Sequence, residues 1–393
     1  MTVDTSSTDD STVGAELAHI EAAVEAGESV LARRFGSAIK LVDPEELPGS
    51  GPATVVRARV ASSPFSLPRT LVIKHYPAPP PAGEVDPFAQ EAVSYQLFTS
   101  LAPEDRMCPE LHAHDHRLRV LVIDDLGDAP TLHDRLKSRD ARGAERALLS
   151  WARSLGKLHA STANREADFD ALLRRLGVRF QGEDATPVVA CAQLPAILER
   201  KLNVVTPDSV RQRAERSAEH ARSASYRAFS PVDLTPDNNL VTSSGVRFLD
   251  FERGRVRNAM VDAAYLRLPF AACPDALALP AGMSEAMVAA WRAEVVVAWP
   301  GLADDVALAA YLMDSLLLLV WHVTWEILPT LGCVRGAGPL SRQAALVSWW
   351  RDLAQQAGRA GLTDVKEHAT EVATMLDIHF GPGLELALYP AFR

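Results

Sequence analysis

Residues 229–252 constrain the fold and the chemistry of this chain more than any other stretch. Within them, two short apolar runs at 240–242 and 246–249 flank a Ser-Ser-Gly turn, which predicts a β-hairpin. Folding the chain about the second serine sets Asn238 opposite Asp250, because each lies six positions from it. Magnesium prefers hard oxygen ligands at about 2.1 Å. An amide and a carboxylate at the mouth of one hairpin therefore predict a metal site.

The loop that enters this hairpin has a spacing typical of phosphoryl transfer. Asp233 and Asn238 are separated by four residues, as in the Asp-x-x-x-x-Asn catalytic loop of kinases. In such a loop the Asp receives the proton of the substrate hydroxyl and the Asn holds Mg²⁺. The alternative interpretation is a turn rich in Asp and Asn that precedes an ordinary hairpin.

A lysine at the end of an apolar run is a second candidate for binding phosphate. Lys74 closes the run Thr-Leu-Val-Ile-Lys, and it is one of only six lysines in a chain with 34 arginines. A strand Lys of this kind neutralises the α and β phosphates of a nucleotide. Glu91 follows seventeen residues later in a helical pattern, where it is the expected partner that holds Lys74 extended.

Backbone groups are expected to bind the rest of a nucleotide. Gly49, Ser50 and Gly51 precede the first strand of a predicted hairpin, where a glycine-rich turn lets amides close over phosphate. From position alone, we expect the carbonyl of Asp124 and the amide of Leu126 to face the adenine. These elements follow one another in the order found in kinases, which favours ATP and Mg²⁺ as cofactors.

The chain resembles the aminoglycoside phosphotransferase and choline kinase-like family, whose members are small-molecule kinases with a protein-kinase-like fold. The similarity runs from about residue 47 to residue 266. The family's His-Gly-Asp-Leu-x-Pro-x-Asn is similar to Pro231-Val232-Asp233-Leu234-Thr235-Pro236-Asp237-Asn238. Its metal-binding Asp, followed by an aromatic residue and an acid, is similar to Asp250-Phe251-Glu252, and a further family Asp looks like Asp262.

The chain departs from the family pattern inside the catalytic loop. Pro231 and Val232 stand where the family has His and Gly. Because that His braces the loop through side-chain contacts, its loss puts the loop conformation and the rate in question. A nucleotide-binding pseudokinase is therefore the alternative function. In the segment Leu-Gly-Lys-Leu-His-Ala, which is similar to the family's helix before its inserted substrate segment, we interpret His159 as a capping or core residue.

The sequence predicts an α+β fold with two lobes, a small antiparallel-sheet lobe and a large helical one, like that of protein kinases. An acidic tail at 1–14 is expected to be disordered, the small lobe to cover 15–126 and the large lobe 127–393. The elements expected in the small lobe are a helix at 15–35, strands at 54–60 and 70–76, a helix at 88–101 and a strand at 118–124.

Charge and cysteine content argue against several other classes of function. The net charge is −10, but residues 1–30 hold seven acids and no Lys or Arg, so most of the acidity is an N-terminal feature. The chain has no basic stripe with interleaved aromatic residues, so its sequence does not favour nucleic-acid binding.

The first residues lack the basic start and apolar run of a secretory signal, which favours the cytoplasm. The four cysteines share no metal-binding spacing, and the alternating His112, His114 and His116 are expected on a loop or edge strand.

One segment, residues 309–328, is apolar enough to raise the question of a membrane span. Asp314, His322 and Glu326 interrupt it, so a buried helix of the large lobe is the better interpretation. At 100° per residue, the three side chains form one polar stripe. The stripe is expected either to face the acceptor substrate or to bind internal arginines.

Motifs and resemblance together imply an ATP- and Mg²⁺-dependent phosphotransferase that acts on a hydroxyl of a small molecule. The acceptor class is an antibiotic sugar or an amino-alcohol metabolite. A protein kinase is disfavoured because no Ala-Pro-Glu follows Asp250 and no room for an activation loop lies between Asp250 and Asp262. The oligomeric state does not follow from the sequence.

Overall fold

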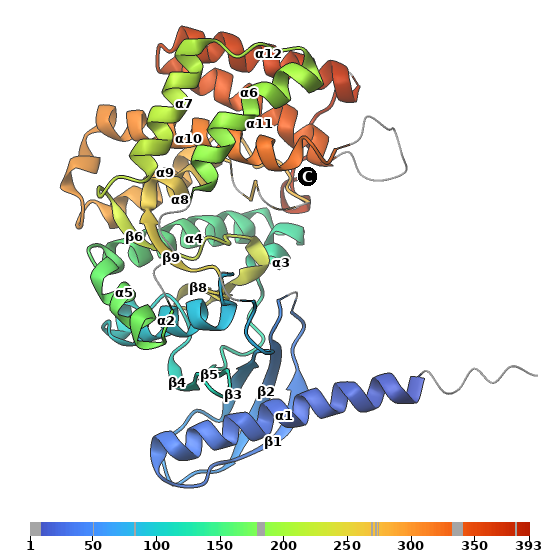
Figure 1. Ribbon diagram of the computed structural model, residues 1–393, viewed down its shortest axis with the longest axis vertical. Coiled ribbons are helices and arrows are strands. Elements are labelled where there is room, and N and C mark those ends of the chain that lie inside the picture. The colour runs from blue at the N-terminus through green and yellow to red at the C-terminus, as the bar shows by residue number, and fades with distance from the viewer. Residues whose placement is uncertain are drawn as a thin grey trace, which may run out of the picture. The chain divides into compact units, whose positions relative to one another are not determined.

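The computed structural model describes residues 9–49, 51–81, 84–178, 185–268, 270–271, 273, 275–331, 341–381 and 383–393 (Figure 1). The chain forms two compact units. The sheet unit consists of Met1–Ala129, Asp168–Phe180 and Phe248–Gly254, and the helical unit of Pro130–Ala167, Gln181–Arg247 and Arg255–Arg393. A small antiparallel sheet in one unit and a large set of helices in the other confirm the predicted α+β fold.

The sheet unit is built on five antiparallel strands in the order β1-β2-β3-β5-β4. They are β1 (Lys40–Glu46), β2 (Thr54–Ser62), β3 (Thr70–His75), β4 (Leu111–Asp115) and β5 (Val120–Asp124). The predicted hairpin of β2 with β3 and the predicted strand β5 are confirmed. The strand β4 carries His112 and His114 at the edge of the sheet, so the expected edge strand is present.

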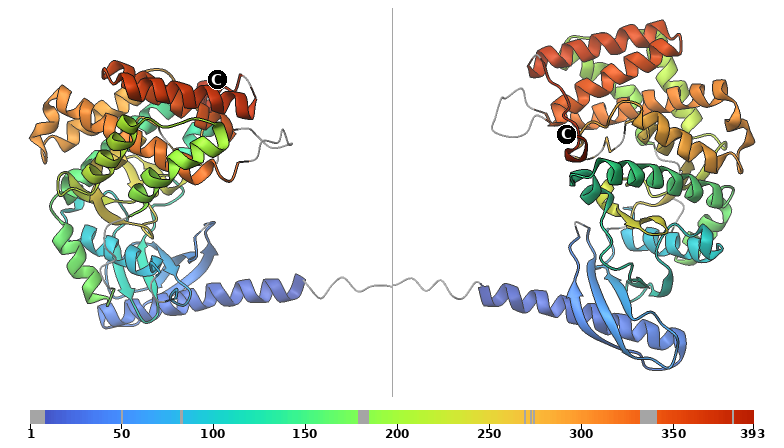
Figure 2. Two further views of the ribbon diagram at one scale, coloured as in Figure 1. Left: turned by 45° about the horizontal axis from the view of Figure 1, so that its top comes forward. Right: turned by 180° about the vertical axis from the view of Figure 1, so that it is seen from behind.

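The helix α1 (Asp9–Phe35) covers one face of this sheet (Figure 2). Its Val30 and Leu31 pack into a buried cluster with Val56 and Ile73. Gly27 allows the close approach, because a Cβ there would lie 3.1 Å from Cγ1 of Ile73. Since successive strand residues point to opposite faces, Lys74, which follows Ile73, belongs to the face that α1 leaves uncovered. The helix starts six residues before the predicted one.

The helix α2 (Pro87–Thr99) lies where a helix was predicted at 88–101. Asp86 caps its N-terminus by accepting a hydrogen bond from the Phe88 amide at 3.1 Å, and Pro87 occupies the first helical position, where its missing N–H is no loss. Ten of its residues are buried, among them Glu91. A buried carboxylate on a helix needs a partner, and that partner defines the candidate site.

The helical unit contains most of the chain's helices and two small ribbons of strands. The ribbons are β6 (Arg227–Ser230) with β9 (Arg255–Asn258) and β7 (Asn239–Thr242) with β8 (Gly245–Phe248). The longer helices are α4 (Ala141–Thr162), α6 (Thr186–Leu202), α7 (Asp208–Ala221), α9 (Met283–Val295), α10 (Asp305–Ile327), α11 (Ser341–Arg359) and α12 (Thr363–Phe380), and the shorter ones are α3 (Leu132–Lys137), α5 (Glu166–Arg175), which continues into the sheet unit, and α8 (Ala259–Tyr265). The β7–β8 pair is the predicted hairpin.

Among the described residues, α10 is the one helix that is long and apolar enough to cross a membrane by length and composition. It packs against α6, α7, α8 and α11, and 56% of its most apolar window is buried. A core helix of this kind meets the same criteria as a membrane span. The interpretation of residues 309–328 as a buried helix agrees with this packing.

Candidate active site

A buried ion pair lies on the face of the five-stranded sheet that is opposite α1. Lys74 Nζ lies 2.6 Å from Oε1 of Glu91, whose side chain is 0% exposed. The pairing predicted from the sequence is therefore confirmed. Oδ1 of Asp250 lies 3.6 Å from the same ammonium. Glu91 is held from two further directions, because the Tyr76 hydroxyl donates to its Oε2 and the Phe251 amide donates to its Oε1 at 3.2 Å.

The electrostatics of this cluster keep the lysine charged. Burial lowers the pKa of Lys74, but the nearby charges of Glu91 and Asp250 outweigh burial, so the pKa is raised above its ordinary value. Glu252 adds to the same effect. The charges of three carboxylates therefore act on one ammonium. Carboxylates repel a nucleotide's phosphates unless a divalent cation enters with them.

The segment before β2 runs close to this acidic group. A Cβ on Gly51 would lie 3.3 Å from Oε2 of Glu252, so a glycine permits the close approach. Gly49 and Gly51 lie on either side of Ser50, which falls outside the described residues. Asp250 lies two residues after the end of β8 and has a φ of +60°. This left-handed backbone conformation is uncommon for a residue other than glycine.

The residues proposed for adenine lie at the end of β5 and in the segment after it. The Asp124 amide donates to the carbonyl of Glu110 at 2.9 Å. The segment around Leu126 is fixed by Arg57 of β2, whose Nε lies 3.0 Å from Asp125 and whose Nη1 lies 2.8 Å from Asp128. This connection holds the chain after β5 against the sheet.

The loop with the Asp-x-x-x-x-Asn spacing belongs to the helical unit and starts at the end of β6. Asp233 accepts a hydrogen bond from the Thr235 amide at 3.0 Å, and both Asp233 and Asn238 are partly exposed. Asn239 is fully buried and donates through Nδ2 to the Thr235 carbonyl. Neighbouring asparagines thus face opposite ways, and only Asn238 remains accessible to a ligand.

Backbone strain and a serine hydroxyl shape the start of this loop. Val232 has a φ of +67°, which is rare for a β-branched residue. Its amide donates to Oγ of the buried Ser230 at 3.0 Å. The same oxygen accepts from Nε of Arg257 at 2.9 Å, while Nη2 of Arg257 pairs with Asp262. Arg257 on β9 therefore ties the loop to α8.

A second set of contacts fixes the orientation of Asp262. His159 Nε2 lies 3.1 Å from its Oδ2, and both side chains are fully buried. The Trp291 indole N–H donates to Nδ1 of His159 at 3.0 Å, so in a neutral ring Nε2 carries the proton and donates to Asp262. Burial raises the pKa of Asp262, but the Arg257 charge and the His159 hydrogen bond outweigh it and hold that pKa below its ordinary value. His159 is the core histidine expected from the sequence.

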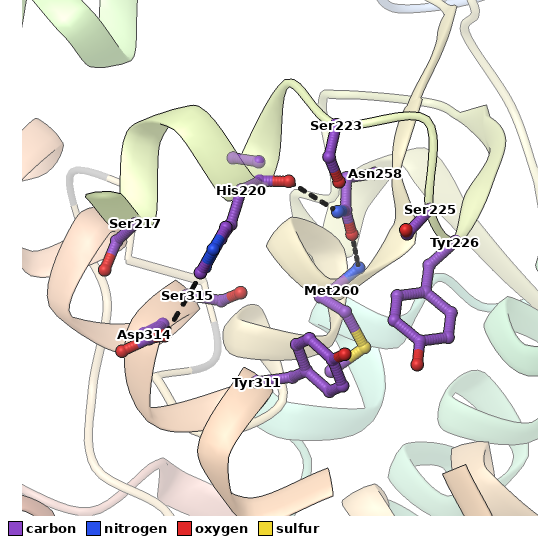
Figure 3. Close-up of a pocket in the computed structure, with 11 residues that line it drawn as sticks. Ser217, His220, Ser223, Ser225, Tyr226, Asn258, Met260, Tyr311, Asp314 and Ser315 are labelled. Atoms are coloured by element: carbon purple, nitrogen blue, oxygen red, sulfur yellow. Dashed lines mark hydrogen bonds and ion pairs between the residues drawn. The ribbon is translucent and has the colours of Figure 1, made fainter. Parts of the chain in front are cut away.

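The structure separates the three members of the polar stripe along α10. Asp314 lies 2.8 Å from Nη2 of Arg213 and lines a cavity described below (Figure 3). Glu326 is twelve residues further on, about 18 Å along the helix axis, and its side chain is 66% exposed. His322 lies between them, 3.8 Å from Glu326. The Arg213 contact matches the alternative in which the stripe binds internal arginines.

Tyr265 at the end of α8 marks where the loop and α10 come together. Burial raises the pKa of its hydroxyl to about 12, and although Arg257 opposes this, the charges of Asp262, Asp233 and Glu326 contribute to the rise. Both Asp233 and Glu326 therefore raise the pKa of the Tyr265 hydroxyl, whereas Asp314 is not among the main causes. The three polar residues of α10 thus have different neighbours and do not form one binding surface.

Four residues of this arrangement were missed by sequence reasoning. Tyr76 could have been found, because it lies two positions after Lys74 and strand alternation sets both on one face. Ser230, Arg257 and Tyr265 carry no spacing signal, since their contacts depend on how β6, β9 and α8 meet.

The donor atoms near Lys74 and in the loop are those that magnesium prefers. The described residues contain no group of three or more His, Cys, Asp or Glu side chains that could hold a metal ion. Magnesium, however, is commonly held by one or two carboxylates together with phosphate oxygens and waters. Asp250 and Glu252 near Lys74, and the amide of Asn238, are donors of the right kind. Asn238 and Asp250 belong to different units, so their shared metal site stays a prediction.

No protein-family model matches the chain, and no curated protein matches it in sequence. Several solved structures are similar to it. A choline/ethanolamine kinase family protein from Mesorhizobium loti is 15% identical with a TM-score of 0.43, covering 85% of this chain and 93% of its own. Choline kinase from Cryptosporidium parvum is 12% identical with a TM-score of 0.45, covering 87% and 88%.

A thermostable mutant of the aminoglycoside phosphotransferase APH(4)-Ia, in ternary complex with AMP-PNP and hygromycin B, is also similar. It is 12% identical with a TM-score of 0.39, and the match covers 89% of this chain and 98% of that one. These structures come from the choline kinase and aminoglycoside phosphotransferase group that the sequence resembles. At 12–15% identity, these similarities do not assign a role to any residue of this chain.

Proposed function

We propose that this protein is an ATP- and Mg²⁺-dependent phosphotransferase that moves the γ-phosphoryl group to a hydroxyl of a small molecule. The observation that carries the proposal is the buried Lys74–Glu91 ion pair with Asp250 at 3.6 Å. A charged lysine among three carboxylates is suited to binding phosphates that arrive together with a metal ion. A lysine that served stability alone would need only one counter-ion.

The roles of the loop residues follow from phosphoryl transfer. The acceptor oxygen attacks the γ phosphorus, its proton passes to the Asp233 carboxylate, and the bond to the bridging oxygen breaks to release ADP. Asn238 and Asp250 would hold Mg²⁺, which neutralises charge on the phosphates when bound. Because Asp233 is fixed by the Thr235 amide, it is positioned before the acceptor arrives.

The nucleotide would contact mainly backbone groups in addition to Lys74. The amides of Gly49, Ser50 and Gly51 would close over the phosphates, and the carbonyl of Asp124 with the amide of Leu126 would bind the adenine edge. Arg57 supports this assignment, since it fixes the segment after β5 through Asp125 and Asp128. A fixed backbone edge loses little freedom when it binds a base.

The acceptor would be a small hydroxylated molecule of the antibiotic-sugar or amino-alcohol type, in the cytoplasm, and not a nucleic acid or a membrane component. Glu326 on α10 is a candidate contact for an amine on this acceptor. His322, next to it on α10, is a further candidate contact. Carboxylates near the reacting hydroxyl favour a cationic substrate in a partly desolvated site.

The test is a screen of hydroxylated metabolites and antibiotics for acceptor-stimulated release of ADP. Asp233→Asn is expected to lower kcat by roughly 10²- to 10⁴-fold while ATP binding survives, which is the usual scale for a lost general base. Asp237→Asn is the matched control, since Asp237 is an exposed carboxylate of the same loop. Near-normal turnover in Asp233→Asn would remove that residue from the mechanism.

A pseudokinase is the second candidate, and it rests on Pro231 and Val232 in the loop. The strained backbone at Val232 is of the kind that clusters at active sites and ligand-binding sites, and a protein that only binds a nucleotide also has such a site. Binding of ATP with Mg²⁺ without any turnover, even slow hydrolysis of ATP, would favour the pseudokinase.

A further inference from the structure

A cavity of about 260 Å³ lies in the helical unit (Figure 3). The cavity and the catalytic loop lie at opposite ends of the β6–β9 ribbon. Asn258, a cavity residue, pairs with Arg227 at one end of β6, whereas Ser230, which begins the loop, pairs with Arg255 at the other. The ends of α7 and α8 and the middle of α10 form the remaining walls. This cavity is not used by the proposed reaction.

The polar groups of the cavity include hydroxyls and one carboxylate. Among the described residues that line it, none is Lys or Arg, and six side chains carry hydroxyl groups. Asp314 is the one carboxylate among them. Its Oδ1 accepts a hydrogen bond from Nη2 of Arg213 at 2.8 Å, and its Oδ2 lies 3.8 Å from Nδ1 of His220, which is beyond hydrogen-bonding distance. One carboxylate oxygen can therefore accept hydrogen bonds from a ligand.

Aromatic rings form another wall. Tyr226 and Tyr311 meet edge to face with ring centroids 5.0 Å apart, and Trp299 meets Tyr226 in the same manner at 5.6 Å. Tyr226 has a φ of +54°, which turns its backbone sharply just before β6. Met260 is a further lining residue. Tyrosine faces attract cations, and a thioether packs well against aliphatic chains.

We propose that this cavity is a second binding site, specific for a small primary amine. An ammonium group has three N–H donors and no acceptor, which matches one carboxylate oxygen surrounded by hydroxyl groups. Its aliphatic stem would lie against Met260 and the tyrosine rings. None of the described lining residues is a Lys or Arg that would bind an anion directly, and a neutral alcohol would leave Oδ2 without a charged donor.

The experiment measures binding of 1-aminobutane, 1-butanol and butyrate to the full chain by ligand-observed NMR. We expect 1-aminobutane to bind at least tenfold more tightly than either of the others. Asp314→Asn should weaken amine binding at least tenfold. Asp305→Asn, an exposed carboxylate at the start of the same helix, is the matched control, and it should leave amine binding unchanged.

Asp314→Asn also removes the partner of Arg213, so a second variant is needed in case the protein unfolds. Ser315→Leu would fill the cavity from α10 while keeping the Asp314–Arg213 pair, and it should abolish amine binding. Retained binding in a folded Ser315→Leu protein would overturn the proposal. Equal binding of 1-butanol would make the cavity a site for neutral molecules, and loss of amine binding only in Glu326→Gln would move the amine to the acceptor site.

Discussion

At the scale of single residues, Glu91 is the side chain with the most restrained position in the candidate site. Its two oxygens receive hydrogen bonds from Lys74, Tyr76 and the Phe251 amide, and none of its surface is exposed. A carboxylate held in this way cannot turn away from the lysine. It therefore keeps the ammonium in one place, which is the condition for precise binding of phosphate.

Lys74→Ala is expected to weaken ATP binding and turnover together, by roughly tenfold or more, since it removes a charged hydrogen-bond donor. Glu91→Gln should weaken both less, because Glu91 acts on the phosphates only through the lysine. The double variant should resemble Lys74→Ala alone, since residues in contact couple. Calorimetry with ATP and Mg²⁺ measures this, with the exposed Lys40→Ala as control. Additive losses would mean that the pair does not act as a unit.

Ser230 and Arg257 support the start of the loop, and their effect should be on rate. Arg257→Lys removes the guanidinium group that contacts both Ser230 and Asp262. We expect kcat to fall by roughly 10- to 100-fold, which is the scale for a small misplacement of a catalytic group. KM for ATP should not change. Ser230→Ala should act similarly and Ser230→Thr, which keeps the hydroxyl, much less.

Steady-state kinetics separate this positioning role from a structural one. The exposed Arg253→Lys serves as the matched control for the loss of a guanidinium group. If Arg257→Lys lowers only the melting temperature and leaves kcat unchanged, the support of the loop has no part in turnover.

At the scale of elements, the sequence predicted those strands whose apolar residues alternate or form a run. The hairpin of β2 and β3 and the hairpin of β7 and β8 were found in this way. The strand β1 was missed because only Leu41 in it is buried and Pro44 interrupts it. The ribbon of β6 and β9 was missed because each strand has four residues and β9 reads Arg-Val-Arg-Asn. Their pairing is decided by tertiary packing, which overrides local propensity.

The candidate site divides in the same way. The Lys74–Glu91 pair was predictable because Lys74 follows an apolar strand pattern and Glu91 lies seventeen residues later in a helical pattern. The support of the loop by Arg257 was not, because it depends on β9 lying beside β6. The position of Asp314 also could not be read from helical periodicity, which gives the face of α10 but not the neighbour along its length.

Asp352 in α11 predicts a pH dependence of stability. Burial, reinforced by the charge of Glu285, raises the pKa of Asp352 from its ordinary value of 3.8 to about 6 in the folded protein. The folded state therefore binds more protons than the unfolded state between pH 4 and 6, so the free energy of unfolding falls as pH rises through that window. A shift of about two pKa units bounds this loss at about 3 kcal/mol.

Asp352→Asn removes the charge and should raise the melting temperature at pH 7.5, with little change at pH 4.5. The exposed Glu371→Gln is the control and should change neither value. Thermal unfolding of the three proteins at both pH values measures the difference. Equal effects of Asp352→Asn at the two pH values would show that this carboxylate is not strained by burial.

At the scale of the whole molecule, the charge around Lys74 predicts that nucleotide binding and metal binding are one event. ATP with Mg²⁺ should raise the melting temperature with increasing concentration, whereas ATP with a chelator should have little effect. Asp250→Ala should abolish the stabilisation by ATP with Mg²⁺, since it removes the proposed metal ligand. Thermal shift measurements across a Mg²⁺ titration test this. Full stabilisation by ATP without metal would contradict it.

The sheet unit is assembled from segments far apart in the chain, and this sets the order of events on the ribosome. Phe251 packs against Tyr95 and Phe98, and its amide binds Glu91. Residues 1–129 therefore emerge with an unfilled apolar site that residues 248–254 complete about 125 residues later. At 5–20 residues per second, that interval is roughly 6–25 s. During it the nascent lobe would be a natural client for chaperones that shield exposed aromatic side chains.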